Sequence, residues 1–275
     1  DMGADANVSF ENEGLFEITG PDAAQLDWAD DSGAAGYVSF SNTGTLRRRT
    51  GMPASDDSAE STWLRAVEIS NAGVIEAESG NLIFAMETGL HMNIGGRWIA
   101  GADGRIIFAA GLYTFYTSSL SGAGEIHVLD KGVVGLMDAA TSSSVATLFV
   151  SSGWQLGLNS TQINGGTLCI GRDGRAAFNT NGSLDRLELR ANGSLIGTGD
   201  LTLTGESAWA GGVLGGSGTI TIAAGATVTR QATEAYPEPL IFAGCALVNK
   251  GTFTWSSGDM GADANVSFEN EGLFE

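Results

Sequence analysis

The chain has 275 residues with a formal net charge of −19 at pH 7, and 41 of the residues are glycine. This acidity argues against nucleic acid as a partner, because phosphate binding requires a basic surface. Disorder is not expected, because 43% of the residues are hydrophobic, enough for a continuous core. A membrane-spanning helix is not expected either, because no apolar run approaches the ~20 residues that cross a bilayer.

The beginning of the sequence returns at its end. Residues 1–17 read DMGADANVSFENEGLFE, and residues 259–275 are identical to them. The chain is therefore one block, residues 1–258, followed by the start of the next identical block, residues 259–275. Neither copy carries the polar cap that a terminal solenoid repeat needs, so we expect a window of a longer tandem array. A protein with only two copies is the alternative.

Short strands separated by Asn-x-Gly turns dominate the first third of the chain. The segments VSFENEGLFEI, YVSFSNTGTLRR and AVEISNAGVIEAESG place alternating apolar residues on both sides of each turn, which is the pattern of strands. Asparagine and glycine tolerate the left-handed backbone that a tight corner requires, and asparagines can stack from coil to coil. The predicted structural turn positions, including those near the end of the chain, are Asn12, Gly14, Asn42, Gly44, Asn71, Gly73, Asn249, Gly251, Asn270 and Gly272.

The spacing of these turns predicts the length of a coil. Asn249 and Asn270 lie 21 residues apart, and the Gly-x-Gly corners that start at Gly197 and Gly216 are 19 apart. Steps of 29 and 30 residues among the first three turns then indicate insertions. We expect surface loops around residues 20–36 and 47–63, which are polar.

The more regular C-terminal third repeats this rhythm in GTGDLTLTGESAWAGGVLGGSGTITIAAGATV. No segment has a sustained period of 3.6 residues, so we predict an all-β fold, a single-stranded parallel β-helix (β-solenoid) of about 12–13 coils with loop insertions. Right-handed coiling is expected, as for parallel crossovers in general. At ~4.8 Å per coil, one block would add ~60 Å to a stack.

The strand–Gly-x-Gly–strand units above and the Asn-x-Gly-Thr units of ALVNKGTFTWSSGDMGADANVSFENEGLFE resemble a known class of proteins. They are similar to the secreted and cell-surface tandem-repeat proteins of bacteria that fold as parallel β-helices of the adhesin-like type. The resemblance covers residues 1–85 and 185–275 best, whereas the aromatic segment GLYTFYTSSL departs from it. It implies an extracellular or cell-surface location.

Side chains that carry chemistry are sparse. Some β-helices cleave polysaccharides with clustered carboxylates, so paired acids are the candidates. These pairs are Asp22 with Asp27, Asp30 with Asp31, and Asp56 with Asp57. All lie in polar segments, where solvated surface charge is the better explanation. His91 and His127 lack any metal-ligand spacing. We expect no enzyme activity, no cofactor and no bound metal.

Three smaller features have structural interpretations. The turn acids Asp103 and Asp173 lack the glycine-rich nonapeptide of calcium-binding solenoids. Arg47-Arg48-Arg49, the one basic cluster, is expected on a solvated face, or paired with an acidic loop. Cys169 and Cys245 are expected to be buried apolar thiols, although a disulfide would need only that they meet in space.

These features favour a structural building block of an extracellular fibre or surface stalk, made of tandem or head-to-tail stacked solenoid repeats. The expected partner is the protein itself, either the adjacent repeat or a head-to-tail neighbour. The alternative is a surface adhesin or passenger domain that binds carbohydrate or protein through the inserted loops. Candidate residues of the repeat–repeat junction are Phe10, Phe16, Trp255, Phe268 and Phe274.

Overall fold

The computed structural model describes residues 8–20, 24–27, 38–55, 61–65, 68–85, 91–129, 132–136, 142–150, 155–159, 162–163, 165–233 and 237–275. In these residues the chain forms strands and turns and no helix, and the strands pair in parallel with their counterparts in the next coil. The predicted parallel β-solenoid is therefore confirmed, but its coils are fewer than the 12–13 expected, because several described coils are longer than 20 residues. The chain divides into two compact units, Asp1–Ala146 (unit 1) and Thr147–Glu275 (unit 2).

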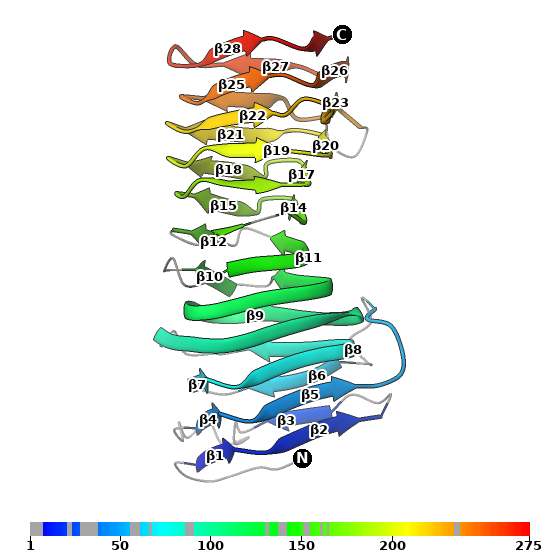
Figure 1. The fold of residues 1–275 in the computed structure, drawn as a ribbon, viewed down its shortest axis with the longest axis vertical. Coiled ribbons are helices and arrows are strands. Elements are labelled where there is room, and N and C mark those ends of the chain that lie inside the picture. Colours follow the sequence, from blue (N-terminus) through cyan, green and yellow to red (C-terminus); the bar gives the residue numbers. More distant parts are fainter. Residues whose placement is uncertain are drawn as a thin grey trace. The chain divides into compact units, whose positions relative to one another are not determined.

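The described strands, labelled in Figure 1, are β1 (Val8–Asn12), β2 (Leu15–Thr19), β3 (Ala24–Asp27), β4 (Val38–Asn42), β5 (Thr45–Arg49), β6 (Ser61–Arg65), β7 (Glu68–Asn71), β8 (Val74–Ala85), β9 (His91–Val128), β10 (Gly132–Leu136), β11 (Ser142–Val150), β12 (Gln155–Leu158), β13 (Gln162–Ile163), β14 (Thr167–Ile170), β15 (Arg175–Phe178), β16 (Gly182–Leu184), β17 (Arg186–Leu189), β18 (Ser194–Gly197), β19 (Leu201–Leu203), β20 (Glu206–Trp209), β21 (Gly212–Gly216), β22 (Thr219–Ile222), β23 (Thr227–Gln231), β24 (Leu240–Ala243), β25 (Ala246–Asn249), β26 (Thr252–Ser257), β27 (Met260–Ala262), β28 (Ser267–Asn270) and β29 (Leu273–Phe274).

Unit 2 has coils of three short strands each. One coil consists of β17, β18 and β19, and each of these strands pairs in parallel with the corresponding strand of the next coil, β20, β21 and β22. Figure 1 shows the strands of this unit stacked one above another. Most steps between paired residues are 19 to 21 residues, the coil length expected from the sequence. The step from Thr227 to Thr252 is longer because residues between β23 and β24 extend that coil.

Unit 1 has longer coils at its start, as the turn spacing predicts. Leu15 pairs with Thr45, and Thr45 pairs with Val74. The two expected surface loops, however, are shorter than predicted. Ala24–Asp27 forms β3, which pairs with Ser61–Arg65 of β6 on a third face of the coil. Polar residues in these short strands concealed them, because a four-residue alternation is too short to stand out in a polar segment. Most of the remainder, residues 28–37 and 56–60, lies outside the described residues.

Aromatic rings fill the core of unit 1. Trp98 is completely buried and lies within 5.2–5.5 Å, between ring centroids, of Phe84, Phe108 and Phe115. Phe115 and Tyr113 belong to the aromatic segment that departs from the resemblance, yet both point into this cluster. The buried Tyr113 hydroxyl lies 2.8 and 2.6 Å from the carbonyl oxygens of Phe84 and Ala110 and shares its one proton between them. The departure therefore reflects a change of core side chains within the same architecture.

We predict that Trp98→Ala lowers the free energy of unfolding by about 4 kcal/mol, because it opens a cavity among rings that cannot collapse. Urea unfolding followed by circular dichroism measures the change. Tyr116→Ala is the matched control, since Tyr116 is 40% exposed, and it should cost less than about 1 kcal/mol. Equal losses for the two variants would contradict the packing described.

Candidate functional site

A ladder of asparagine side chains runs along the Asn-x-Gly corners of unit 1. The Nδ2 of Asn12 donates to Oδ1 of Asn42 at 2.7 Å, and the Nδ2 of Asn42 donates to Oδ1 of Asn71 at 2.7 Å. Each amide also donates to a backbone carbonyl of the next coil, that of Thr45 or Val74, at 3.0 Å. All three asparagines are buried. The ladder thus has a direction, with every amide donating toward the C-terminal side.

The same ladder occurs in unit 2. The Nδ2 of Asn249 donates to Oδ1 of Asn270 at 2.7 Å and to the carbonyl oxygen of Leu273 at 2.8 Å. Asn270 is the second copy of Asn12, so one asparagine of the repeat is seen in both of its roles. As Asn270 it accepts from the coil before it, and as Asn12 it donates to the coil after it.

The glycines of these corners are needed because the backbone of the preceding coil lies directly against them, and not because they adopt a left-handed conformation. A Cβ at Gly44 would collide with the carbonyl oxygen of Gly14, and one at Gly73 would collide with that of Gly44. At the other end, a Cβ at Gly272 would meet the carbonyl oxygen of Gly251. None of these five described glycines has a positive φ. The expectation of left-handed corners at Asn-x-Gly is therefore wrong, since the glycine is needed because adjacent coils touch there.

The first copy of the duplicated segment packs against the coil that follows it. The ring of Phe10 in β1 stacks on Phe40 with centroids 5.5 Å apart and an interplanar angle of 11°. Phe16 in β2 lies opposite Leu46 in the register. Within the copy, Phe10 and Phe16 make an edge contact at 5.3 Å. Phe40 and Leu46 are both almost fully buried as a result.

The second copy packs against the coil that precedes it. The ring of Phe274 stacks on Phe253 at 5.3 Å with an interplanar angle of 11°, and Phe268 lies opposite Leu247. Phe268 and Phe274 repeat the edge contact of the first copy, at 5.5 Å. The anchor on the preceding coil is thus Phe253, which the junction prediction missed. Trp255 is 44% exposed instead, although the alternation in TFTW predicts that Phe253 and Trp255 point to the same side of the strand.

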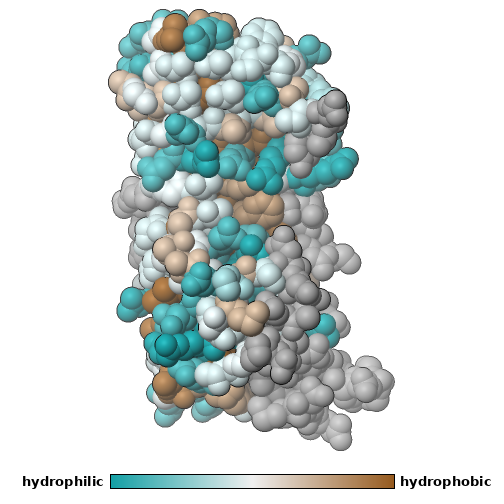
Figure 2. All heavy atoms as spheres, turned by 90° about the vertical axis from the view of Figure 1, so that its right-hand side faces the viewer, coloured by the Kyte–Doolittle hydropathy of each residue, from teal (hydrophilic) through white to brown (hydrophobic). Residues whose placement is uncertain are grey.

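An apolar hollow lies over the second copy. It encloses about 220 Å³ and is lined by Met260, Val266, Phe268 and Phe274, with Phe242 and Phe253 of the coil before. Phe268, Leu273 and Phe274 are 40–52% exposed. Brown atoms at the upper end of the view in Figure 2, where Figure 1 shows β28, mark apolar surface on this side of unit 2.

Charged side chains alternate along one row of unit 1. Arg47 lies between Glu17 and Glu76 in the register, with its guanidinium 3.7 Å from the first carboxylate and 2.8 Å from the second. The hydrogen bond to Glu76 is the main cause that raises the pKa of Arg47. Arg49 pairs with Glu78 at 3.1 Å. Arg48 points the other way and is fully buried, and this burial lowers its pKa. The basic cluster is therefore divided between an ion-paired surface and the interior.

The structure does not describe the side chains of the candidate catalytic acids. Asp22, Asp30, Asp31, Asp56 and Asp57 lie outside the described residues. Of Asp27 and His91 the structure describes only the backbone, in β3 and β9. Most residues of the inserted loops, on which the alternative function of binding carbohydrate or protein depends, also lie outside the described residues.

His127 takes part in the clearest polar cluster. Its Nε2 lies 2.9 Å from Oε2 of Glu125, and Arg105 places Nη2 2.8 Å from the same oxygen. The hydrogen bond to His127, aided by the charge of Arg105, lowers the pKa of Glu125 to about 2. This cluster of Arg105, Glu125 and His127 holds adjacent parts of β9 together. Oε2 of Glu125 is already bonded to both neighbours.

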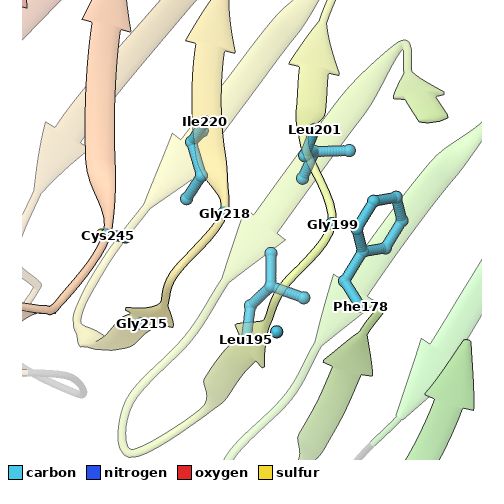
Figure 3. A pocket seen from close by; sticks show the side chains of 9 residues that line it. Phe178, Leu195, Gly199, Leu201, Gly215, Gly218, Ile220 and Cys245 are labelled. Atoms are coloured by element: carbon cyan, nitrogen blue, oxygen red, sulfur yellow. The ribbon is translucent and has the colours of Figure 1, made fainter. Parts of the chain in front are cut away.

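Among the described residues no group of three or more His, Cys, Asp or Glu is arranged to hold a metal ion. The buried Cys169 and Cys245 are not bonded to each other, and burial raises the pKa of the Cys245 thiol. Figure 3 shows a hollow in unit 2 lined by Phe178, Leu195 and other side chains. It holds only about 10 Å³, room for about one water molecule and for no larger ligand.

No protein-family model, curated protein or solved structure matches the chain. In the part of the chain that is described, no helix is long and apolar enough to cross a membrane.

We predict that Asn42→Ala destabilises the protein by about 3 kcal/mol, because in a buried position the Asn12 side-chain amide loses one of its two acceptors and Oδ1 of Asn71 loses its donor. Denaturant unfolding measures the loss. Asn179→Ala removes a similar bond, to Asn159 at 2.8 Å, but in an exposed position. This control should destabilise the protein by less than about 1 kcal/mol. If Asn179→Ala and Asn42→Ala destabilise it equally, the buried asparagine ladder does not contribute the stability proposed here.

Glu125→Gln should make the stability depend differently on pH. The folded pKa of Glu125 is about 2, below the ordinary value of 4.5, so the ionised carboxylate stabilises the fold above that value. This contribution is lost as the pH falls toward 2. Since the side chain is 40% exposed, we expect Gln to cost only about 1 kcal/mol at pH 6.

Unfolding in urea between pH 2 and pH 6 measures the difference from the unaltered chain, which should shrink to nothing at the acid end. Glu206→Gln, at an exposed position of unit 2, is the control and should shift stability by less than about 0.5 kcal/mol. A constant difference across the pH range would contradict the assignment.

Proposed function

We propose that the protein is a structural building block of an extracellular fibre or surface stalk, in which blocks of 258 residues continue one β-solenoid. The observation that carries this proposal is the duplicated segment. Its first copy fits the coil after it, and its second copy fits the coil before it, through the same asparagine and the same phenylalanines. One segment therefore has the contacts to join the end of one block to the start of the next.

Such an array would work mechanically. Parallel backbone ladders hold each coil to its neighbours, and buried amides such as those of Asn12, Asn42 and Asn249 add a second line of hydrogen bonds. Because coils contact only their neighbours, stability in a solenoid grows with length. The acidic composition, −19 over the chain, would keep neighbouring fibres apart.

The proposed extracellular or surface location rests on the resemblance to secreted tandem-repeat proteins. Enzyme activity is not part of the proposal, because the described polar clusters are ion pairs that hold coils together, as in the contact of His127 and Arg105 with Glu125. The partner is the adjacent repeat, or a neighbouring molecule docked head to tail.

A chain of two blocks, residues 1–258 followed by residues 1–275, tests the proposal. Electron microscopy should show one continuous particle that is longer than the 275-residue chain by the height of one block, at ~4.8 Å for each coil. Two separate particles joined by a tether would overturn the proposal.

A glycine at the junction provides the matched variant. In the two-block chain, Gly272→Ala places a methyl group against the carbonyl oxygen of Gly251, whereas Gly14→Ala meets nothing within 4 Å. We predict that the first change breaks the particle at its middle, or destabilises it there, and that the second leaves it intact. The two glycines occupy the same position of identical seventeen-residue segments, so they differ only in whether a coil precedes them. If both variants form equally intact particles, Gly251 does not lie against Gly272, and the proposed junction is wrong.

A further inference from the structure

We propose that a band of arginines on the side of unit 2 binds a linear polysaccharide that carries carboxylate groups. This arginine band consists of Arg172, Arg175, Arg186 and Arg190, which come from two successive coils. The site lies on the side of the solenoid, so it does not depend on how one block is joined to the next.

Positive charge in unit 2 is concentrated in this band. Residues 147–190 carry the four arginines and three acids, whereas residues 191–275 carry two cations and nine acids. One of those two cations, Arg230, is fully buried. Figure 2 shows hydrophilic side chains gathered across unit 2 at the level where Figure 1 labels β14 and β17. In an otherwise acidic unit, this band is therefore the surface that attracts an anion.

The arginines project from a rigid sheet and are accessible to a ligand. Arg186 begins β17 and Arg190 directly follows it, and their side chains are 45% and 43% exposed. The side chain of Arg172, in the turn of the preceding coil, is 70% exposed, and Arg175 is exposed at the start of β15.

The shape of the band favours a thin ligand. Four residues of a strand span ~13 Å, so Arg186 and Arg190 offer their charges along a line and not over a broad area. A linear polyanion can follow this line within the two coils. A globular acidic partner would also approach the acids of the later coils, such as Asp200 and Glu206, and would be repelled by them.

The structure shows how these guanidiniums hold a carboxylate. Glu188 lies between two of them on β17, with Oε2 3.0 Å from Nη2 of Arg190 and Oε1 3.4 Å from Nη1 of Arg186. A planar guanidinium pairs well with a planar carboxylate. Glu188 also competes with the carboxylates of a ligand. Removal of its charge should therefore strengthen binding.

The test measures binding of the 275-residue chain to carboxymethyl-cellulose by calorimetry in 0.01 M salt, where screening is weak. Glu188→Gln should bind about 3-fold more tightly, because two guanidiniums lose their internal partner. The double variant Arg172→Gln, Arg190→Gln should bind about 10-fold more weakly. In 1 M salt, where charges are screened beyond about 3 Å, binding should be lost.

Unit 1 supplies matched controls. Arg49 pairs with Glu78 at 3.1 Å, and Arg47 lies beside them. Glu78→Gln and the double variant Arg47→Gln, Arg49→Gln change the net charge equally, and they should leave binding within about 2-fold of the unaltered chain. Circular dichroism shows whether each variant keeps the fold.

The proposal is overturned if the unaltered chain does not bind carboxymethyl-cellulose, or if it binds the neutral hydroxyethyl-cellulose equally well. It is also overturned if the controls behave like the band variants, or if Glu188→Gln weakens binding. Tighter binding of single-stranded DNA would assign the band to nucleic acid instead. Self-association in 0.01 M salt that the arginine variants abolish would assign it to a second copy of the chain.

Discussion

The distance between stacked coils is the constraint on which this structure depends. Paired parallel strands lie about 4.8 Å apart, and at the Asn-x-Gly corners the backbones of successive coils come into direct contact. Gly44 and Gly73 can have no side chain there, because the carbonyl oxygen of the previous coil occupies the place of a Cβ. The asparagine two residues earlier uses the same closeness, since its amide reaches the equivalent amide of the next coil at 2.7 Å.

This spacing also determines what the core can contain. A side chain that points inward meets the equivalent side chain one coil away, so like residues form rows, as in the ring stacks of Phe10 on Phe40 and of Phe274 on Phe253. Unit 1 widens its rows into a cluster of aromatic rings around Trp98. Unit 2 has a smaller aromatic cluster, in which the ring centroid of Trp209 lies 5.7 Å from that of Phe253, beside rows of leucine and isoleucine such as Leu201 opposite Ile220. Both solutions preserve the strand register, which explains why the segment with unusual composition remains in the same fold.

The fold could be predicted from the sequence because its signals are local and repeated. Alternation around Asn-x-Gly and a spacing near 20 residues suffice for a parallel solenoid. The reason for the glycines was missed, because a sequence cannot distinguish a residue needed for its φ from one needed for the space beside it. Strands β3 and β6 were missed because their short alternation lies in polar segments. Phe253 was passed over for Trp255, since which ring lies against the next coil depends on where the coil turns.

Buried arginine is the residue that composition least predicts in such a core. Arg230 is fully buried, yet its guanidinium donates to the carbonyl oxygens of Ala210, Glu238 and Asp259 at 2.6–3.2 Å. Those carbonyls belong to coil corners, where the backbone turns and strand pairing ends. A planar group with five donors can satisfy several such oxygens at once, although burial still lowers the pKa of Arg230.

The sides and the ends of a solenoid therefore use charge differently. Along the sides the backbone is already paired, so residues such as Glu17, Arg47 and Glu76 only add ion pairs to coils that are held together without them. At an end the strand edge offers both hydrogen bonds and apolar surface to any strand of matching register. A charge beside such an edge therefore acts on any strand that approaches it, whereas a charge on a side mainly raises the net charge of the molecule.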